Sequence, residues 1–176
     1  SRDAIVAAGL DWKVELKKVF ADSQQGPILC PDNFATVRLS DHSVLGVVGN
    51  RYVPVQNAES FEFFDSIVGE KLAMYHTAGS LKNGKVIWLL AKLPDTMKVK
   101  GKDHIEKYLV LSSSHDGSLC LRVYFTNVRI VCWNTMMASL SDFDSKEGVV
   151  IRHTANVMNK LDQAKETLGF AMNYYN

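Results

Sequence analysis

The segment from residue 119 to residue 140 constrains the fold most, because its hydrophobic period changes partway along. In its first part Leu121, Val123 and Phe125 alternate with polar residues, and this alternation predicts a β-strand. After Asn127 the apolar residues follow a helical spacing, which predicts a helix or a buried turn into one. A strand that runs directly into a buried element is a junction at which a core forms, so we expect strands and helices to share one core.

The rest of the chain predicts more elements of both kinds. Strands are expected at 12–16, at 34–39 paired with 44–48, at 72–81, 86–93, 104–112, 119–126 and 149–152. The Asn83–Gly84 pair is a strong signal for a tight turn between the strands on either side of it. We expect residues 21–32 to form a loop, because they are rich in Ser, Gln, Gly and Pro. Residues 95–103 are expected to form a second, charged loop.

Helices are expected at residues 2–10, at 57–69 with Asn57 as the N-cap, and at the end of the chain after the N-cap Thr154. The final helix has a narrow apolar stripe formed by Val157, Leu161, Ala164, Leu168 and Ala171. This stripe can dock on its own domain or pair with another chain. Together the elements predict an α+β fold, with an antiparallel β-meander, a β-hairpin and helices packed on one face. We expect residues 1–176 to form a single domain of a longer protein.

Composition limits the classes of function. The net charge is +1, so no global field draws the chain to nucleic acid or membrane, and a polyanion site must be a local patch. The longest apolar runs are too short to cross a bilayer, and Cys30, Cys120 and Cys132 form no CxxC pair. We therefore expect a cytoplasmic protein with reduced thiols and no metal site. The glycine-rich loops that bind nucleotide phosphates are absent from the sequence, so we expect no nucleotide cofactor.

A nucleic-acid surface is the first candidate site. Proteins that bind single strands need positive charges to hold phosphates and aromatic faces to stack on bases. The candidate residues are Arg122, Arg129, Arg152, Lys160, Lys165, Arg51, Tyr52, Lys98 and Lys100, with Arg38 and Lys102 beside them. Tyr124 and Trp133 are further candidates for stacking. The alternative is that these residues are solvated charges and core aromatics.

Two groups of residues could instead carry catalysis. His115 and Asp116 could form a catalytic pair, but the following Gly117 favours a plain hairpin turn. His153 precedes a predicted helix, where a histidine with satisfied hydrogen bonds in the capping region is favoured over an anion contact or a catalytic base. Cys132 and His153 could form a nucleophile and a base, but Cys132 lies in an apolar run where a thiol stays protonated. We expect no enzyme activity, and a hydrolase is the weaker alternative.

Several segments, taken in order, resemble the phage/plasmid-like protein family, which is catalogued as a domain of unknown function (number 932). These segments are AGLDWKVE at 8–15, LGVVGNRYVPVQNAESFEFFD at 45–65, AGSLKNGKVIWLLAKLP at 78–94, SSHDGS at 113–118, VRIVCWNT at 128–135 and IRHT at 151–154. The resemblance implies a protein of phages, prophages or plasmids. The order of elements is also similar to the core of the eukaryotic single-strand-annealing recombinases.

This similarity of fold implies binding of single-stranded DNA by a ring-like or filament-like oligomer, without a nucleotide cofactor, and it assigns no individual residue. The leading hypothesis is therefore a mobile-element protein that binds single-stranded DNA and takes part in annealing or recombination. The alternative is a self-associating interaction module that binds no nucleic acid.

Overall fold

The computed structural model describes residues 2–72, 74–93, 106–141, 143 and 148–174. Within them the chain forms two antiparallel sheets and four helices, which confirms the α+β class. The first sheet contains β1 (Val14–Ala21), β2 (Ile28–Arg38) and β3 (Val44–Gly49). The second contains β4 (Met74–Leu81), β5 (Val86–Lys92), β6 (Tyr108–Ser114), β7 (Leu121–Thr126) and β8 (Gly148–Ile151). The helices are α1 (Arg2–Ala7), α2 (Asn57–Leu72), α3 (Trp133–Ser141) and α4 (Val157–Tyr174).

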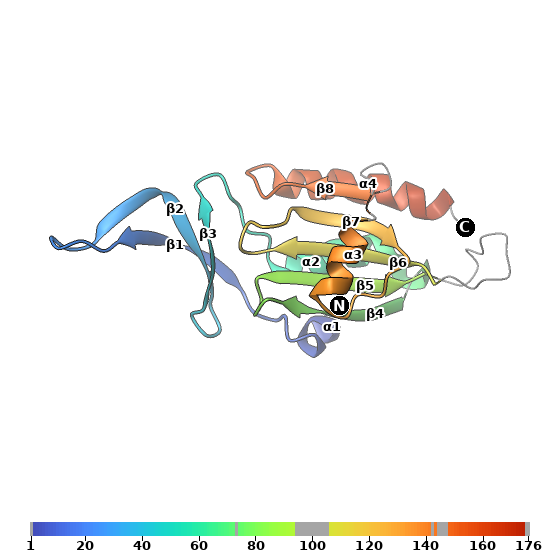
Figure 1. Ribbon diagram of the computed structural model, residues 1–176. Helices are drawn as coiled ribbons and strands as arrows, with labels where there is room; N and C mark the ends of the chain where they lie inside the picture. The colour runs from blue at the N-terminus through green and yellow to red at the C-terminus, as the bar shows by residue number, and fades with distance from the viewer. Residues whose placement is uncertain (1, 73, 94–105, 142, 144–147, 175–176) are drawn as a thin grey trace.

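The second sheet is the predicted meander, with each strand antiparallel to the one before it (Figure 1). Its central strands β5 and β6 are buried along most of their length because helices cover both faces. On one face α2 and α4 pack against Leu89, Leu111 and other apolar side chains of the sheet. On the other face α3 packs against Leu90, Val110 and their neighbours. The expectation that all helices lie on one face was therefore wrong for α3.

The final helix docks on its own domain. Val157, Leu161, Ala164 and Leu168 are all buried in the main core, which confirms the predicted stripe over these residues. The side chain of Ala171, its last predicted member, lies outside the described part of the structure. The helix begins later than predicted, since the carbonyl of Asn156 accepts the first helical hydrogen bond, from the Lys160 amide. Across the described ranges, no helix is long and apolar enough to span a membrane.

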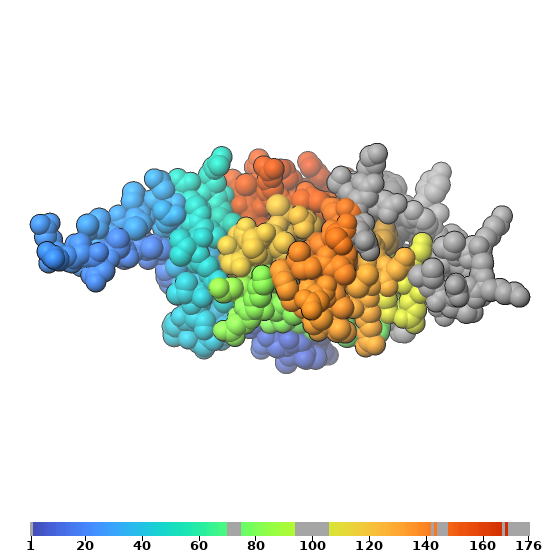
Figure 2. All heavy atoms as spheres, in the orientation of Figure 1, coloured from blue at the N-terminus to red at the C-terminus, as the bar shows by residue number. Residues whose placement is uncertain are grey.

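Half of the segment expected to be a loop at residues 21–32 is strand. Ile28, Leu29 and Cys30 pair with Ala21, Phe20 and Val19, so only residues 22–27 turn. A register shift between Lys18 and Val19 accommodates the extra residues around Pro31, which cannot donate a ladder hydrogen bond. The resulting two-stranded ribbon projects from the body of the protein (Figures 1 and 2).

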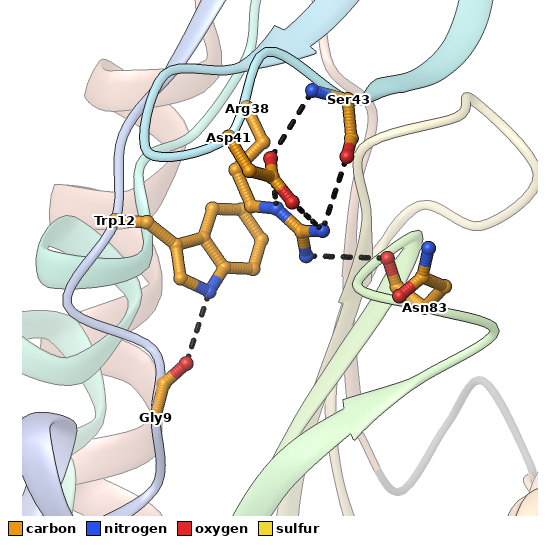
Figure 3. Close-up of polar contacts among 6 residues, drawn as sticks. All are labelled: Gly9, Trp12, Arg38, Asp41, Ser43 and Asn83. Carbon is orange, nitrogen blue, oxygen red and sulfur yellow. Dashed lines mark hydrogen bonds and ion pairs between the residues drawn. The ribbon is translucent and has the colours of Figure 1, made fainter.

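Arg38 joins the two sheets (Figure 3). Its guanidinium donates to both carboxylate oxygens of Asp41, at 2.9 and 2.6 Å, and to the carbonyl of Asn83 in the β4–β5 turn at 3.3 Å. It also lies 5.3 Å from the centre of the Trp12 ring. These contacts hold the base of the ribbon against the second sheet, so Arg38 is a structural residue and not part of an open cationic surface.

Candidate anion-binding site

Two segments that are about a hundred residues apart form a pocket at the end of the second sheet. One segment is the turn after β3 and the other follows β8; both lie at the end of the sheet that faces the first sheet (Figure 1). The pocket has a volume of about 390 Å³ and is lined by Gly49, Asn50, Arg51, Tyr52, Arg152, His153 and Thr154. It therefore brings together three of the predicted nucleic-acid residues, Arg51, Tyr52 and Arg152.

Backbone hydrogen bonds hold the two segments together. The Tyr52 amide donates to the Gly49 carbonyl at 3.0 Å and closes a tight turn that carries Arg51. The Val53 amide then donates to the His153 carbonyl at 3.1 Å. The positions of both arginines are thus fixed at the backbone, while their side chains remain exposed.

Tyr52 and His153 form the inner wall of the pocket. Their rings stack with centroids 4.9 Å apart and planes inclined by 20°. The Tyr52 hydroxyl donates to the Ser114 carbonyl at 2.7 Å, which ties the wall to the end of β6. Burial, and then the negative charge of Asp116, raise the pKa of Tyr52, so this phenol stays neutral.

The His153 ring is held on both nitrogens. Nδ1 lies 3.3 Å from the Val53 carbonyl, which can only accept, so Nδ1 carries a proton. Nε2 lies 3.1 Å from the Ser113 hydroxyl, which donates to it when the ring is neutral. Burial lowers the pKa of His153. The expectation of a histidine with satisfied hydrogen bonds near a helix start is confirmed, and these bonds join the linker before α2 to the sheet.

A second buried histidine lies behind the first. His115 is completely buried, and its Nε2 donates to Asn57 Oδ1 at 2.8 Å. The Asn57 amide nitrogen donates in turn to the Leu10 carbonyl at 3.0 Å, which fixes the orientation of the amide. Asn57 is therefore a tether between three segments and not the N-cap of α2. The N-cap is Gln56, whose backbone amide donates to Glu59 Oε2 at 2.7 Å, as in a capping box.

The two pocket arginines carry free positive charge. In the part of the chain that the structure describes, neither guanidinium forms an ion pair, whereas Arg38 and Lys165 are each paired with an aspartate. Two guanidinium groups at one pocket favour a bound anion, and their planar forks match phosphate oxygens. The Thr154 hydroxyl adds a polar group to the same wall.

The other predicted residues do not join this site. Arg122 is half-buried on the face of the second sheet that α3 covers, and its guanidinium carbon lies 5.9 Å from the centre of the Phe143 ring. Arg129 is exposed after β7, near Tyr108, and Lys160 and Lys165 lie on α4. Lys98, Lys100 and Lys102 lie outside the described residues. The predicted cationic residues therefore form separate groups.

Two of the predicted stacking residues are also not freely exposed. Tyr124 is only 1% exposed and its hydroxyl bonds with Ser139, so it is a core aromatic and cannot stack on a base. Trp133 is half-buried, and Lys82 Nζ lies 3.5 Å from the centre of its ring.

The catalytic alternatives gain no support. His115 is buried in a hairpin bend in which the Ser118 amide donates to Asp116 Oδ1, so the turn interpretation is confirmed. Cys132 is exposed at the start of α3, contrary to the expectation of an apolar site, and its backbone amide donates to Thr135 Oγ1 at 3.0 Å. The pocket contains His153 but neither Cys132 nor His115.

The comparison with protein families identifies one match. The model of the family described as Domain of unknown function (DUF932) matches residues 44–176, which include every residue of the pocket. No curated protein and no solved structure matches the chain. The match covers most of the sequence, so the chain belongs to the DUF932 family.

Proposed function

We propose that this protein binds single-stranded DNA, with Arg51 and Arg152 holding a backbone phosphate in the pocket at the end of the second sheet. The observation that carries the proposal is the convergence of two unpaired guanidinium groups from distant segments on one pocket. Because the chain has a net charge of only +1, such a local site has to provide most of the attraction for a polyanion.

The proposed ligand is a flexible single strand, because such a strand can bend to bring a backbone phosphate to both guanidinium groups. The Tyr52 ring offers limited stacking, because His153 covers one of its faces. The proposed contact is therefore mainly electrostatic, and we expect a weak dependence on base sequence.

We further propose that the protein belongs to a phage or plasmid and that binding serves annealing or recombination without a nucleotide cofactor. This part rests on the resemblance of the sequence segments and of the order of elements. It predicts that the protein accelerates pairing of two complementary oligonucleotides in the absence of ATP, as measured by energy transfer between dyes on the two strands.

Binding can be tested with fluorescent oligothymidine and a duplex of equal length over a salt series. Each phosphate contact on a single strand contributes about −0.7 to the slope of log K against log salt. Arg51→Gln and Arg152→Gln should each weaken binding about fivefold to tenfold and make the slope shallower by that amount. Lys165→Gln is the matched control, because it removes the same charge from a side chain already paired with Asp162. Absence of binding at low salt, or equal losses in all three variants, would contradict the proposal.

Self-association is a second candidate function. The apolar stripe of α4 is buried, so it no longer supports this idea, but the projecting ribbon provides a different basis. Phe20 and Leu29 pair across the ribbon, share one of its faces and are 54% and 43% exposed. A second copy of this chain would bury them, since exposed apolar patches mark interaction sites and most soluble oligomers are made of identical subunits. Light scattering should then give a mass that falls with Phe20→Thr but not with Lys18→Thr; a monomeric wild-type protein at every concentration would rule this out.

A further inference from the structure

His153 is the one residue in the pocket whose charge can change near neutral pH. It lines the cavity together with Arg51 and Arg152, and it stacks on Tyr52. Its unperturbed pKa is 6.5, and burial lowers this value. In the empty pocket at neutral pH the ring is therefore mostly neutral, and the two arginines supply the positive charge.

The hydrogen-bond partners of His153 are compatible with both the neutral and the protonated ring. The Val53 carbonyl accepts from Nδ1 in both states. The Ser113 hydroxyl donates to Nε2 in the neutral ring and can rotate to accept from Nε2 in the protonated ring. Protonation of His153 therefore leaves no ring N–H without a partner and requires no rearrangement of the backbone.

The neighbouring His115 lacks this property. Its Nδ1 is buried and has no partner among the described residues, so a proton there would be an unsatisfied buried donor. The two histidines lie close enough for their charges to repel, since a charge on His153 helps to keep His115 neutral. Of the two histidines, His153 is thus the one that can be protonated without leaving a buried N–H group unpaired.

Burial is the main influence on the pKa of His153, and the charged groups nearby come from several elements. Arg51 and Arg152 line the same pocket, and the neutral Tyr52 and His115 approach the ring from the linker and from the end of β6. The negative charge of Asp116 acts on both Tyr52 and His115. A second carboxylate, that of Asp32, accepts a hydrogen bond at 3.0 Å from the side chain of Asn50, which also lines the pocket. Neither carboxylate forms an ion pair with Arg51 or Arg152 among the described residues, so a bound anion is the group that would offset a third positive charge.

We propose that His153 is a pH-dependent third cation of this site, so that an anion held by Arg51 and Arg152 promotes protonation of the ring and binds more tightly as the pH falls. The inference rests on the proposed binding of a phosphodiester. By linkage, each unit by which the bound phosphate raises the pKa of His153 strengthens binding at acid pH about tenfold. Because burial lowers the pKa of His153 from 6.5 and a bound anion would raise it again, the affinity should increase as the pH falls from neutrality.

The test uses the binding of oligothymidine at constant ionic strength, because neither phosphodiester groups nor thymine titrate in this range. Wild-type protein should bind about threefold to tenfold more tightly at pH 6 than at pH 8. His153→Gln keeps one donor and one acceptor in place but cannot take up a proton, so its affinity should be nearly the same at both pH values. Wild-type binding that is independent of pH, or a pH dependence that persists in His153→Gln, would overturn the inference and leave the proposed function intact.

Histidine NMR provides a second readout that does not need the variant. The apparent pKa of His153 should rise when oligothymidine is added, while His115 remains untitrated over the same range. A His153 titration that is unchanged by bound oligonucleotide would also refute the inference. Absence of oligonucleotide binding at both pH values in low salt is a different outcome, because it refutes the proposed function itself.

Discussion

Acidification should destabilise this protein well above the pH at which carboxylates titrate, and His115 is the main cause. The ring is completely buried beside the edge of Trp12, with centroids 5.2 Å apart, and bonds through Nε2 to Asn57. Its burial, and then the proximity of His153, lower the pKa of His115 to about 4, although Asp116 acts in the opposite direction. In the unfolded chain the pKa returns to 6.5.

The sign and size of the effect follow from these two values. Below pH 6.5 the unfolded chain binds a proton that the folded protein excludes, so the free energy of unfolding decreases as the pH falls. The loss begins near 6.5 and is complete below about 4, where a difference of about 2.5 pKa units corresponds to about 3 kcal/mol. By pH 5 the expected loss from His115 alone is about 2 kcal/mol, which is a large part of the stability of an ordinary domain.

Urea denaturation followed by tryptophan fluorescence between about pH 7.5 and about pH 5 measures this loss. The matched variant is His115→Gln, whose amide can still donate to Asn57 but cannot titrate. We expect it to start from a lower stability, because it packs less well, and to lose about 2 kcal/mol less over the same range. The lowered pKa of His153 adds a loss of the same sign that both proteins share. Parallel pH curves for the two proteins would refute the reasoning.

Three further predictions concern packing. Gly46→Ala should destabilise the fold by about 1–3 kcal/mol in urea denaturation, because the new Cβ would lie 2.6 Å from the Asp116 Cα; Gly49→Ala, with no atom within 4 Å, should change stability by less than about 0.5 kcal/mol. Leu161→Ala should cost about 2–5 kcal/mol, because this buried side chain fixes α4 to the core, and a loss below 1 kcal/mol would show that the helix is not docked. Arg38→Met should accelerate amide hydrogen exchange in the β4–β5 turn, because it removes the bond to the Asn83 carbonyl; unchanged exchange there would show that the two sheets are held together by other contacts.

The order of the elements followed from the sequence because it depends on local patterns. Local hydrophobic patterns predicted the four successive strands β4–β7, and the Asn83–Gly84 pair gave the turn between the first two of them, where Asn83 has a φ of 58° and Gly84 a φ of 90°. The apolar stripe of α4 predicted its buried face. These signals act over a few residues, so a single sequence contains them in full.

The ribbon and the helix caps were misjudged because they depend on partners that are distant along the chain or compete locally. Residues 28–32 have the composition of a loop, yet residues 28–30 pair with β1. Asn57 is a residue type that often serves as an N-cap. Here its side chain forms hydrogen bonds with the buried His115 and the Leu10 carbonyl, and Gln56 takes the capping position. Helix propensity cannot anticipate such a tertiary contact.

The sequence by itself thus determined the kinds of elements, their order and the presence of Arg51, Tyr52 and Arg152 as candidate ligands for an anion. Only the tertiary structure decided which of the candidates meet. It placed Arg51 and Arg152 at one pocket and Arg122 on the face of the second sheet that α3 covers. It also paired Arg38 with Asp41 and buried Tyr124. The physical reason is that strand order and the path of a linker decide which distant side chains meet at one site. Long-range packing sets both, and the local hydrophobic pattern of the sequence does not reveal it.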